Sequence, residues 1–463
     1  MTVPDPAPGA PALWGPREVP TTALLTDHYE LTMLQAALQA GTADRPCVFE
    51  LFARRLPPGR RYGVVAGVGR ALRAIEHFRF DAEALEFLRG AHVVDGPTAD
   101  WLAGFRFDGD IWGYPEGETY FPGSPIVVVE SSFAAGVVLE TVLLSIYNHD
   151  AAIASAASRM SAMAGARPCI EMGSRRTQEL AAVAAARAAY VAGFEATSNL
   201  EAGRRYGVPT RGTSAHSFTL LHTDERAAFA AQVAALGEDT TLLVDTYDVE
   251  AAVRTAVELT GGRLGAVRLD SGDLAVMASK VRRQLDDLGA THTRIIVTSD
   301  LDEFTIAALS GAPVDGYGVG TALVTGSGHP TCGFVYKLVA RAESDEPGAP
   351  LVPVAKKSAD KISVGGRKYA VRQLSADGVA EAELVGVGAV PRRDSDDREL
   401  LVPLVRRGEI VGREPLEAAR QRHLRSRAEL PIEAGKMSRG EPVLETVYAG
   451  AGTSGNPYAP EQP

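Results

Sequence analysis

The sequence predicts an α/β fold built on a parallel sheet, and two observations between residues 165 and 325 support this. Apolar runs of about four to six residues end in polar residues or glycine, and each is followed by a segment with helical spacing. The runs end near residues 245, 270, 300 and 320, a separation typical of strand–helix units in parallel sheets. Polar and apolar residues do not alternate within the runs, so we expect strands covered on both faces.

The elements expected in this region form a regular series. The strands are Thr241–Val244, Leu264–Leu269, Ile295–Thr298 and Val314–Val319, and the helices between them are Val249–Leu259, Leu274–Leu288 and Glu303–Leu309. Because chemistry in barrels and open sheets lies at the carboxyl ends of strands, the residues there are candidates for a site. They are Asp245, Asp270, Asp273, Asp300, Gly320 and Thr321. The acids are either helix N-caps or parts of one site, where they would hold Mg²⁺ or orient a cationic or histidine side chain.

The residues before 165 predict a mixture of helices and strands. Apolar residues at helical spacing follow Thr26 and Asp27, either of which would cap the first helix, and Gly41 would end it. We expect helices over Tyr29–Ala40, Tyr62–Phe78, Ala82–Leu88 and Ser132–Met163, and strands over Arg45–Phe52 and Ile126–Glu130.

Composition excludes several classes of protein. The 463 residues include 47 Lys and Arg against 58 Asp and Glu, a net charge of −11 that argues against a chain-wide nucleic-acid binder. The 45% hydrophobic content is typical of globular proteins and excludes global disorder. The three cysteines, Cys47, Cys169 and Cys332, form neither a disulfide framework nor a Cys-x-x-Cys metal pair, which fits a reducing compartment.

Membrane and targeting segments are not expected. The most apolar segment, Phe133–Ile146, is interrupted by Glu140, and the N-terminus lacks the basic start and apolar core of a signal peptide. We therefore expect a cytoplasmic protein that does not enter a membrane. Residues 1–19 and 449–463, rich in Pro, Ala and Gly, are expected to be flexible tails, and the acidic, Pro-rich Glu343–Pro353 is expected to be a linker or exposed loop.

A histidine in a polar setting is the first candidate for chemistry. His216 lies in Gly212-Thr213-Ser214-Ala215-His216-Ser217, where hydroxyl side chains surround it. A structural role and a reactive role are equally compatible with this setting. If the imidazole acts as a nucleophile, a carboxylate must fix its tautomer from the other ring nitrogen, and Asp245 and Asp270 are the candidates.

Three further groups of residues indicate an anionic ligand. Arg175 and Arg176 follow Gly173, and paired guanidinium groups at a helix start are suited to phosphate or carboxylate. Arg268 lies in an apolar strand, so it must either pair with a neighbouring aspartate or clamp a substrate carboxylate. Gly316–Thr321 lacks the lysine of a P-loop and fits a phosphate cradle at a late barrel strand.

A basic segment follows the proline-rich one. It comprises Lys356, Lys357 and Lys361, followed by Arg367 and Lys368. This segment is either a solvated β-hairpin or a loop that faces a polyphosphate.

Taken together, seven segments resemble the nicotinate phosphoribosyltransferase family, and the resemblance covers residues from about 24 to 370. In chain order the segments are Thr26–Met33, Glu171–Arg176, Gly212–Phe218, Val267–Asp273, Gly318–Thr321, Val335–Leu338, and Lys357-Ser358 with Gly366–Lys368. Each segment is weak alone, but seven in the family's order are specific.

The resemblance implies a type II phosphoribosyltransferase fold, in which an irregular α/β barrel lies beside an α+β domain built from both ends of the chain. The implied ranges are a tail at 1–19, an N-terminal α+β domain at 20–130, a barrel at 131–342, a C-terminal segment packing on the N-terminal domain at 343–448, and a tail at 449–463. It also implies a homodimer with active sites shared between subunits.

The implied reaction joins nicotinate to 5-phosphoribosyl 1-pyrophosphate in NAD salvage, with ATP hydrolysed alongside, Mg²⁺ as cofactor and His216 phosphorylated. By resemblance, Asp245 and Asp270 orient His216, while the metal ligands stay unassigned. Expected nicotinate contacts are Tyr29, Thr213, Arg268 and Arg175, and expected phosphoribosyl pyrophosphate contacts are Thr321, Gly320, Gly318, Asp300 and Lys337, with Lys357 a weaker candidate.

Three alternatives stay open. A nicotinamide phosphoribosyltransferase would share the fold and the histidine, and the environment of Arg268 should distinguish a neutral from an anionic ring. A quinolinate phosphoribosyltransferase needs no ATP and has a shorter chain. An inactive regulatory barrel would bind nucleotides without catalysis.

Overall fold

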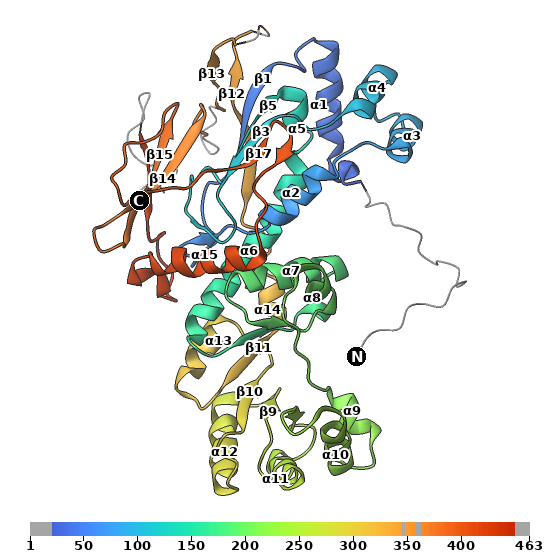
Figure 1. Cartoon of the computed structure of the whole chain (residues 1–463), viewed down its shortest axis with the longest axis vertical. Coiled ribbons are helices and arrows are strands. Elements are labelled where there is room, and N and C mark those ends of the chain that lie inside the picture. Colours follow the sequence, from blue (N-terminus) through green and yellow to red (C-terminus); the bar gives the residue numbers. More distant parts are fainter. Residues whose placement is uncertain (1–20, 345, 347, 357–362, 450–463) are drawn as a thin grey trace.

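The two main sheets lie one above the other along the long axis of the molecule, and helices lie at the level between them (Figure 1). The computed structural model describes residues 21–344, 346, 348–356 and 363–449. The expected tails at 1–19 and from 450 onward, and Lys357, lie outside these residues.

The lower sheet has six strands, all parallel, in the order β7-β6-β11-β10-β9-β8. Its strands are β6 (Cys169–Glu171), β7 (Ala196–Thr197), β8 (Thr241–Leu243), β9 (Ala266–Leu269), β10 (Arg294–Val297) and β11 (Gly316–Val319). The sheet curls into half of a barrel, which confirms the predicted α/β fold class. Since the strands are parallel, their carboxyl ends meet at one edge.

The helices of this half-barrel begin where the sequence predicts, because aspartates cap them. Helices α11 (Val249–Thr260), α12 (Leu274–Asp287) and α13 (Glu303–Ala308) follow β8, β9 and β10. Asp248, Asp273 and Asp302 accept hydrogen bonds from the backbone amides of Ala251, Val276 and Thr305, at 2.8, 3.2 and 2.7 Å. Asp273 therefore acts as an N-cap, the structural alternative for an acid at a strand end.

The upper sheet has seven strands and combines both ends of the chain, in the order β13-β12-β1-β5-β3-β17-β18. Its strands are β1 (Pro46–Ala53), β3 (Asp110–Gly113), β5 (Val127–Ser132), β12 (Phe334–Ala342), β13 (Leu351–Pro353), β17 (Val402–Arg406) and β18 (Glu409–Ile410). Strand β12 lies within the range expected for the barrel, but it pairs with β1 in this sheet. The last part of the expected linker, Leu351–Pro353, is strand β13, which pairs antiparallel with β12 and so belongs to this sheet.

Smaller elements complete the fold. Strands β14 (Lys368–Leu374), β15 (Ala380–Val387), β16 (Arg398–Glu399) and β19 (Glu445–Ala449) form a third sheet, and β2 (Gly63–Val64) pairs with β4 (Thr119–Tyr120). The other helices are α1 (His28–Gln39), α2 (Val68–Glu76), α3 (Ala82–Gly90), α4 (Gly96–Gly104), α5 (Phe133–Val137), α6 (Glu140–Ala164), α7 (Glu179–Val191), α8 (Leu200–Tyr206), α9 (His216–Leu221), α10 (Glu225–Leu236), α14 (Thr321–Val324) and α15 (Leu416–Ala428).

Two predicted helices differ from the structure. The helix expected over Tyr62–Phe78 begins only at Val68, because residues 63 and 64 pair with β4 and Gly67 adopts a positive φ of 98°. The helix expected over Ser132–Met163 is divided into α5 and α6. By length and composition, Phe133–Ala164 could cross a membrane, but 67% of its most apolar window is buried inside the protein. Side chains of α6 contribute to the cores beside both sheets, so α6 is an interior helix that joins them.

Buried ion pairs connect the C-terminal segment to the upper sheet. Lys368 Nζ lies 2.7 Å from Glu50 Oε2 on β1, and both side chains are buried. Arg367 Nε donates to Glu130 Oε1 on β5 at 2.9 Å. These two residues of the basic segment therefore point inward, and neither expectation, a solvated hairpin or a polyphosphate-facing loop, holds for them.

Removing one member of the Lys368–Glu50 pair should destabilise the protein strongly. We expect Lys368→Met to lower the free energy of unfolding by about 3–5 kcal/mol, because it leaves the Glu50 carboxylate buried without a counter-charge. The double variant Glu50→Leu/Lys368→Met should recover a large part of the loss, since no charge is then stranded. Urea unfolding of the full chain measures both, and equal losses in the single and double variants would contradict this.

Candidate functional site

The carboxyl edge of β8 and β9 holds a histidine–aspartate pair. His216 is the first residue of α9, and its Nε2 lies 3.1 Å from Asp245 Oδ1, which follows β8. Because a carboxylate can only accept, Nε2 carries the proton, and the lone pair of the neutral ring is on Nδ1. Asp245 is 4% exposed and His216 41% exposed, so a fixed carboxylate holds an accessible imidazole.

The second oxygen of Asp245 connects this pair to β9. Asp245 Oδ2 accepts hydrogen bonds from the Asp270 amide at 2.9 Å and from Ser271 Oγ at 2.7 Å. Of the two candidate partners for His216, Asp245 is therefore the direct one, and the carboxylate of Asp270 is used elsewhere.

Arg268 is the centre of a second cluster on the same edge. It is 8% exposed on β9, and its Nη2 lies 2.7 Å from Asp270 Oδ1. Its Nε donates to Thr298 Oγ1 and its Nη1 to Thr213 Oγ1, both at 2.9 Å. The ion pair with a neighbouring aspartate, one of the two roles expected for Arg268, is thus present.

The environment of Asp270 keeps it ionised. Burial raises the pKa of this carboxyl, but hydrogen bonds from Thr298 and Arg268, together with the positive charge of Arg268, outweigh burial and lower the pKa below its ordinary value. The cluster is therefore a fixed cation–anion pair at neutral pH.

The end of β11 provides a glycine-rich turn two strands away. A Cβ at Gly318 would lie 2.5 Å from Thr298 Cγ2 and 2.7 Å from Met172 Sδ, so only glycine fits there. At Gly320 the nearest atom to such a Cβ would be Met172 O at 3.5 Å, and Thr321 is exposed beyond it. Arg175 is exposed in the 3₁₀ turn that follows β6. These residues share the edge that carries His216.

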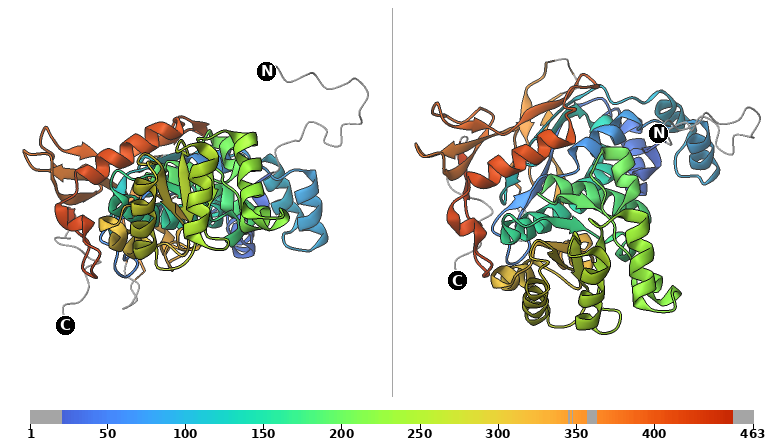
Figure 2. Two further views of the ribbon diagram at one scale, coloured as in Figure 1. Left: turned by 90° about the horizontal axis from the view of Figure 1, so that it is seen from below. Right: turned by 60° about the horizontal axis from the view of Figure 1, so that its bottom comes forward.

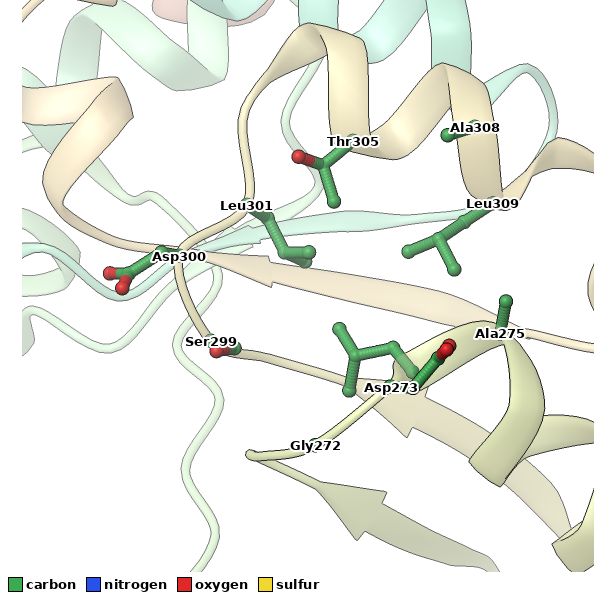
Figure 3. A pocket seen from close by; sticks show the side chains of 10 residues that line it. Gly272, Asp273, Ala275, Ser299, Asp300, Leu301, Thr305, Ala308 and Leu309 are labelled. Atoms are coloured by element: carbon green, nitrogen blue, oxygen red, sulfur yellow. The ribbon is translucent and has the colours of Figure 1, made fainter.

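Asp300 lies beside a pocket between α12 and α13 (Figure 3). The pocket has a volume of about 290 Å³, with Asp273 and Asp300 among its lining residues. In Figure 3 the carboxylate of Asp300 points away from Leu301 and Leu309. The preceding residue, Ser299, has a φ of 118°, a strained value for a residue with a side chain.

The acids at the strand ends divide between two roles that the sequence left open, helix capping and the orientation of a histidine or cationic side chain. Asp245 binds His216, Asp270 pairs with Arg268, and Asp273 caps α12. Within the described ranges, no group of three or more His, Cys, Asp or Glu side chains is arranged to hold a metal ion.

Tyr29 and Lys337 lie apart from this edge within one chain. Tyr29 is on α1, which Figure 1 places at the opposite end of the molecule from α9. Lys337 is on β12, and its Nζ lies 3.8 Å from Glu140 Oε1. Burial and the charge of Glu140 raise the pKa of Tyr29 to about 12, so Tyr29 is also near Glu140 and is neutral at physiological pH. Tyr29 is 44% exposed, which leaves its ring accessible.

Sequence reasoning missed three residues of the edge. Thr298 bonds both Arg268 and Asp270, Ser271 bonds Asp245, and Glu171 is buried at the end of β6. Their signal was weak, because a hydroxyl or carboxyl at a strand end is also common in turns and caps. The available clue was that Thr298 and Glu171 end or directly follow an apolar strand and that Ser271 lies two residues beyond one.

The curled parallel sheet beside a layer made from both chain ends is the architecture of type II phosphoribosyltransferases. Residues 24–148 match the nicotinate phosphoribosyltransferase (NAPRTase) N-terminal domain. The chain is 59% identical to nicotinate phosphoribosyltransferase pncB1 of Mycobacterium tuberculosis over 432 residues, covering 91% of this chain and 94% of that protein. The protein belongs to the nicotinate phosphoribosyltransferase family, an enzyme family.

More distant relatives support the same family assignment. The nicotinate phosphoribosyltransferase of Bacillus subtilis is 38% identical, over 76% of this chain and 73% of that protein. The crystal structure of human nicotinic acid phosphoribosyltransferase superimposes with a TM-score of 0.78 at 26% identity, covering 92% of this chain and 97% of that chain. The similarity therefore extends over both sheets.

The ionised state of Asp270 should make its contribution to stability depend on pH. A carboxyl whose pKa is lowered by folding stabilises the fold above its unfolded pKa of about 4, and this stabilisation is lost as the pH falls through the folded pKa. We expect Asp270→Asn to lower the free energy of unfolding by about 1–2 kcal/mol at pH 7 and by less at pH 3. Urea unfolding at both pH values measures this, and a pH-independent difference would contradict it.

Proposed function

We propose that the protein condenses nicotinate with 5-phosphoribosyl 1-pyrophosphate in NAD salvage, giving nicotinate mononucleotide and pyrophosphate, with ATP hydrolysed alongside. The ring nitrogen of nicotinate attacks C1 of the ribose, so a C–N bond forms as the C–O bond to pyrophosphate breaks. The observation that carries the proposal is the cluster in which the buried Arg268 and the exposed Thr213 lie on the same sheet edge as the His216–Asp245 pair.

His216 is the residue that we propose ATP phosphorylates. Its Nδ1 lone pair attacks the γ-phosphorus, an N–P bond forms and ADP leaves; later hydrolysis releases phosphate. Asp245 supports this role because its hydrogen bond to Nε2 fixes the tautomer that leaves Nδ1 nucleophilic and stabilises the positive ring once Nδ1 is phosphorylated. Asp270 acts through the backbone bond that orients Asp245.

Nicotinate binds, in this proposal, between Arg268 and an aromatic ring. Arg268 and Thr213 are positioned to contact the carboxylate, and Arg175 is exposed at the same edge. Tyr29 is the proposed stacking partner. Since Tyr29 is exposed on α1 and distant from α9 in its own chain, it would contribute to the site of a second subunit, which supports a homodimer with shared sites.

Phosphoribosyl pyrophosphate is proposed to lie over the end of β11, with Gly318, Gly320 and Thr321 against its 5′-phosphate. Lys337, like Tyr29, would come from the partner of a homodimer. Mg²⁺ is usually held by one or two carboxylates and the substrate's phosphates. The lack of a three-ligand group among the described residues is therefore compatible with Mg²⁺, and Asp300 would provide the carboxylate. When bound, Mg²⁺ would stabilise the negative charge that develops on the leaving pyrophosphate.

One observation favours nicotinamide as the alternative substrate. Asp270 already neutralises Arg268 at 2.7 Å, which reduces the positive charge available to an anionic ring. The relatives reported above are nevertheless named as nicotinate phosphoribosyltransferases, and Arg268 donates to Thr213 in a direction that a substrate carboxylate could take over.

Substrate assays distinguish these functions. With phosphoribosyl pyrophosphate and Mg²⁺, we expect product from nicotinate and little from nicotinamide, with a faster rate when ATP is added. Incubation with γ-labelled ATP should give an acid-labile, base-stable label on the protein, and His216→Ala should lose the label while keeping slow transferase activity. Label that persists in His216→Ala would contradict the phosphohistidine, and a preference for nicotinamide would contradict the substrate.

The role of Arg268 has its own test. We expect Arg268→Ala to raise the KM for nicotinate about 30- to 150-fold, because truncating a hydrogen-bonded charge at a ligand costs about 2–3 kcal/mol. The KM for phosphoribosyl pyrophosphate should change far less. Thr298→Val serves as a control, since it removes one bond to Arg268 but keeps the guanidinium. Equal losses for both substrates in Arg268→Ala would contradict the clamp.

A further inference from the structure

Glu171 is a buried carboxylate at the same edge for which the proposed reaction has no role. It ends β6 and is 0% exposed. Both of its oxygens are used: Oε1 accepts the amide hydrogen of Gly173 in the following turn, and Oε2 accepts the hydroxyl hydrogen of Thr197 at the end of β7. One side chain thus joins a turn to the neighbouring strand.

The turn held by Glu171 contacts β11 on its other side. The Met172 amide donates to Val319 O at 2.8 Å. A Cβ at Gly173 would overlap Cγ1 of Val324 and lie 3.0 Å from Gly320 O, so the turn is packed directly against the glycine-rich end of β11. A displacement of Gly173 would therefore also displace Gly320 and Thr321.

The same turn also determines the positions of the exposed residues Arg175 and Arg176. Arg175 and Arg176 follow Gly173 within two or three residues in a 3₁₀ turn, and the Arg176 amide donates to Gly173 O at 2.8 Å. Asn199 Nδ2 donates to Ser174 Oγ at 3.0 Å, a second bond from the β7 side. The turn that Glu171 holds therefore positions the two arginines and also contacts Gly320 at the end of β11.

We propose that Glu171 is a positioning residue that aligns the Gly173–Arg176 turn with Gly320 and Thr321 and so shapes the subsite for the phosphates of phosphoribosyl pyrophosphate. This inference rests on the proposed function, because that function assigns Gly320 and Thr321 to phosphoribosyl pyrophosphate. It adds a residue that touches no substrate and acts only through the Gly173 amide and the Thr197 hydroxyl.

The sheet order separates this role from that of His216. Strand β6 is the second strand from one end of the sheet, next to the edge strand β7. Strands β8 and β9, beside the His216–Asp245 pair, lie at the other end, with β11 and β10 between them and β6. Loss of the Glu171 bonds should therefore disturb the phosphate side of the edge and leave phosphorylation of His216 by ATP intact.

The test measures binding and labelling in the full-length protein. We expect Glu171→Ala to weaken binding of phosphoribosyl pyrophosphate with Mg²⁺ about tenfold or more by isothermal titration, and to raise its KM similarly, because small misplacements of positioning groups cost this much. The label from γ-labelled ATP should stay within about twofold of wild type. Glu171→Gln keeps an acceptor for the Gly173 amide and should recover most of the binding, while Thr197→Val, which removes one of the two bonds, should give an intermediate loss.

A matched control separates positioning from stability. Glu116 is another buried carboxylate; it accepts the backbone amides of Gly67 and Gly69 at 2.7 and 3.2 Å and also pairs with Arg187 on α7. Glu116→Gln should lower the thermal midpoint without weakening phosphoribosyl pyrophosphate binding. Wild-type binding in Glu171→Ala, or equal weakening in Glu116→Gln, would overturn the role of Glu171 while leaving the proposed function in place. Failure of the wild-type protein to bind phosphoribosyl pyrophosphate would overturn both.

Discussion

The carboxylate of Asp245 accepts hydrogen bonds on both of its oxygens, and these bonds hold three separate segments in one arrangement. One oxygen fixes His216 at the start of α9, and the other fixes the backbone of Asp270 and the hydroxyl of Ser271 beyond β9. A buried carboxylate needs such partners, because desolvation without them would be costly. Satisfying Asp245 therefore also sets the geometry of the histidine and of the Arg268 cluster beside it.

The edge is organised as two halves that meet at β10 and β11. Thr298 bonds Arg268 and Asp270 on one side, and its methyl group packs against the backbone of Gly318 on the other. Met172 fills the remaining space over Gly318, which brings the turn after β6 into the same contact. Side chains of ordinary size thus connect the histidine half to the glycine-rich half, and a larger residue at Gly318 would separate them.

The net charge of the whole chain is negative, whereas several of the residues proposed to bind the substrates are positively charged. The net charge of −11 argues against polyanionic partners, yet Arg175, Arg268 and Lys337 are the residues proposed for anionic substrates. Much of the remaining charge serves the fold: Lys368 and Arg367 pair with Glu50 and Glu130 between the C-terminal segment and the upper sheet. Sequence alone could not separate these uses, because the pattern around an arginine does not show whether its partner is a ligand or a distant carboxylate; Arg367 and Glu130 are 237 residues apart.

Local patterns in the sequence determined the parallel strands, the aspartate caps of α11 to α13 and the polar residues at the strand ends, because periodicity and capping depend on neighbours in the chain. They did not determine that Asp245, rather than Asp270, faces His216, that Asp273 only caps a helix, or that β12 joins the upper sheet. Tertiary structure decided these points, because which strands pair and which side chains meet depends on contacts between distant segments. The buried partners Thr298 and Glu171 became visible only when parallel pairing brought the ends of β6, β7, β9, β10 and β11 to one edge.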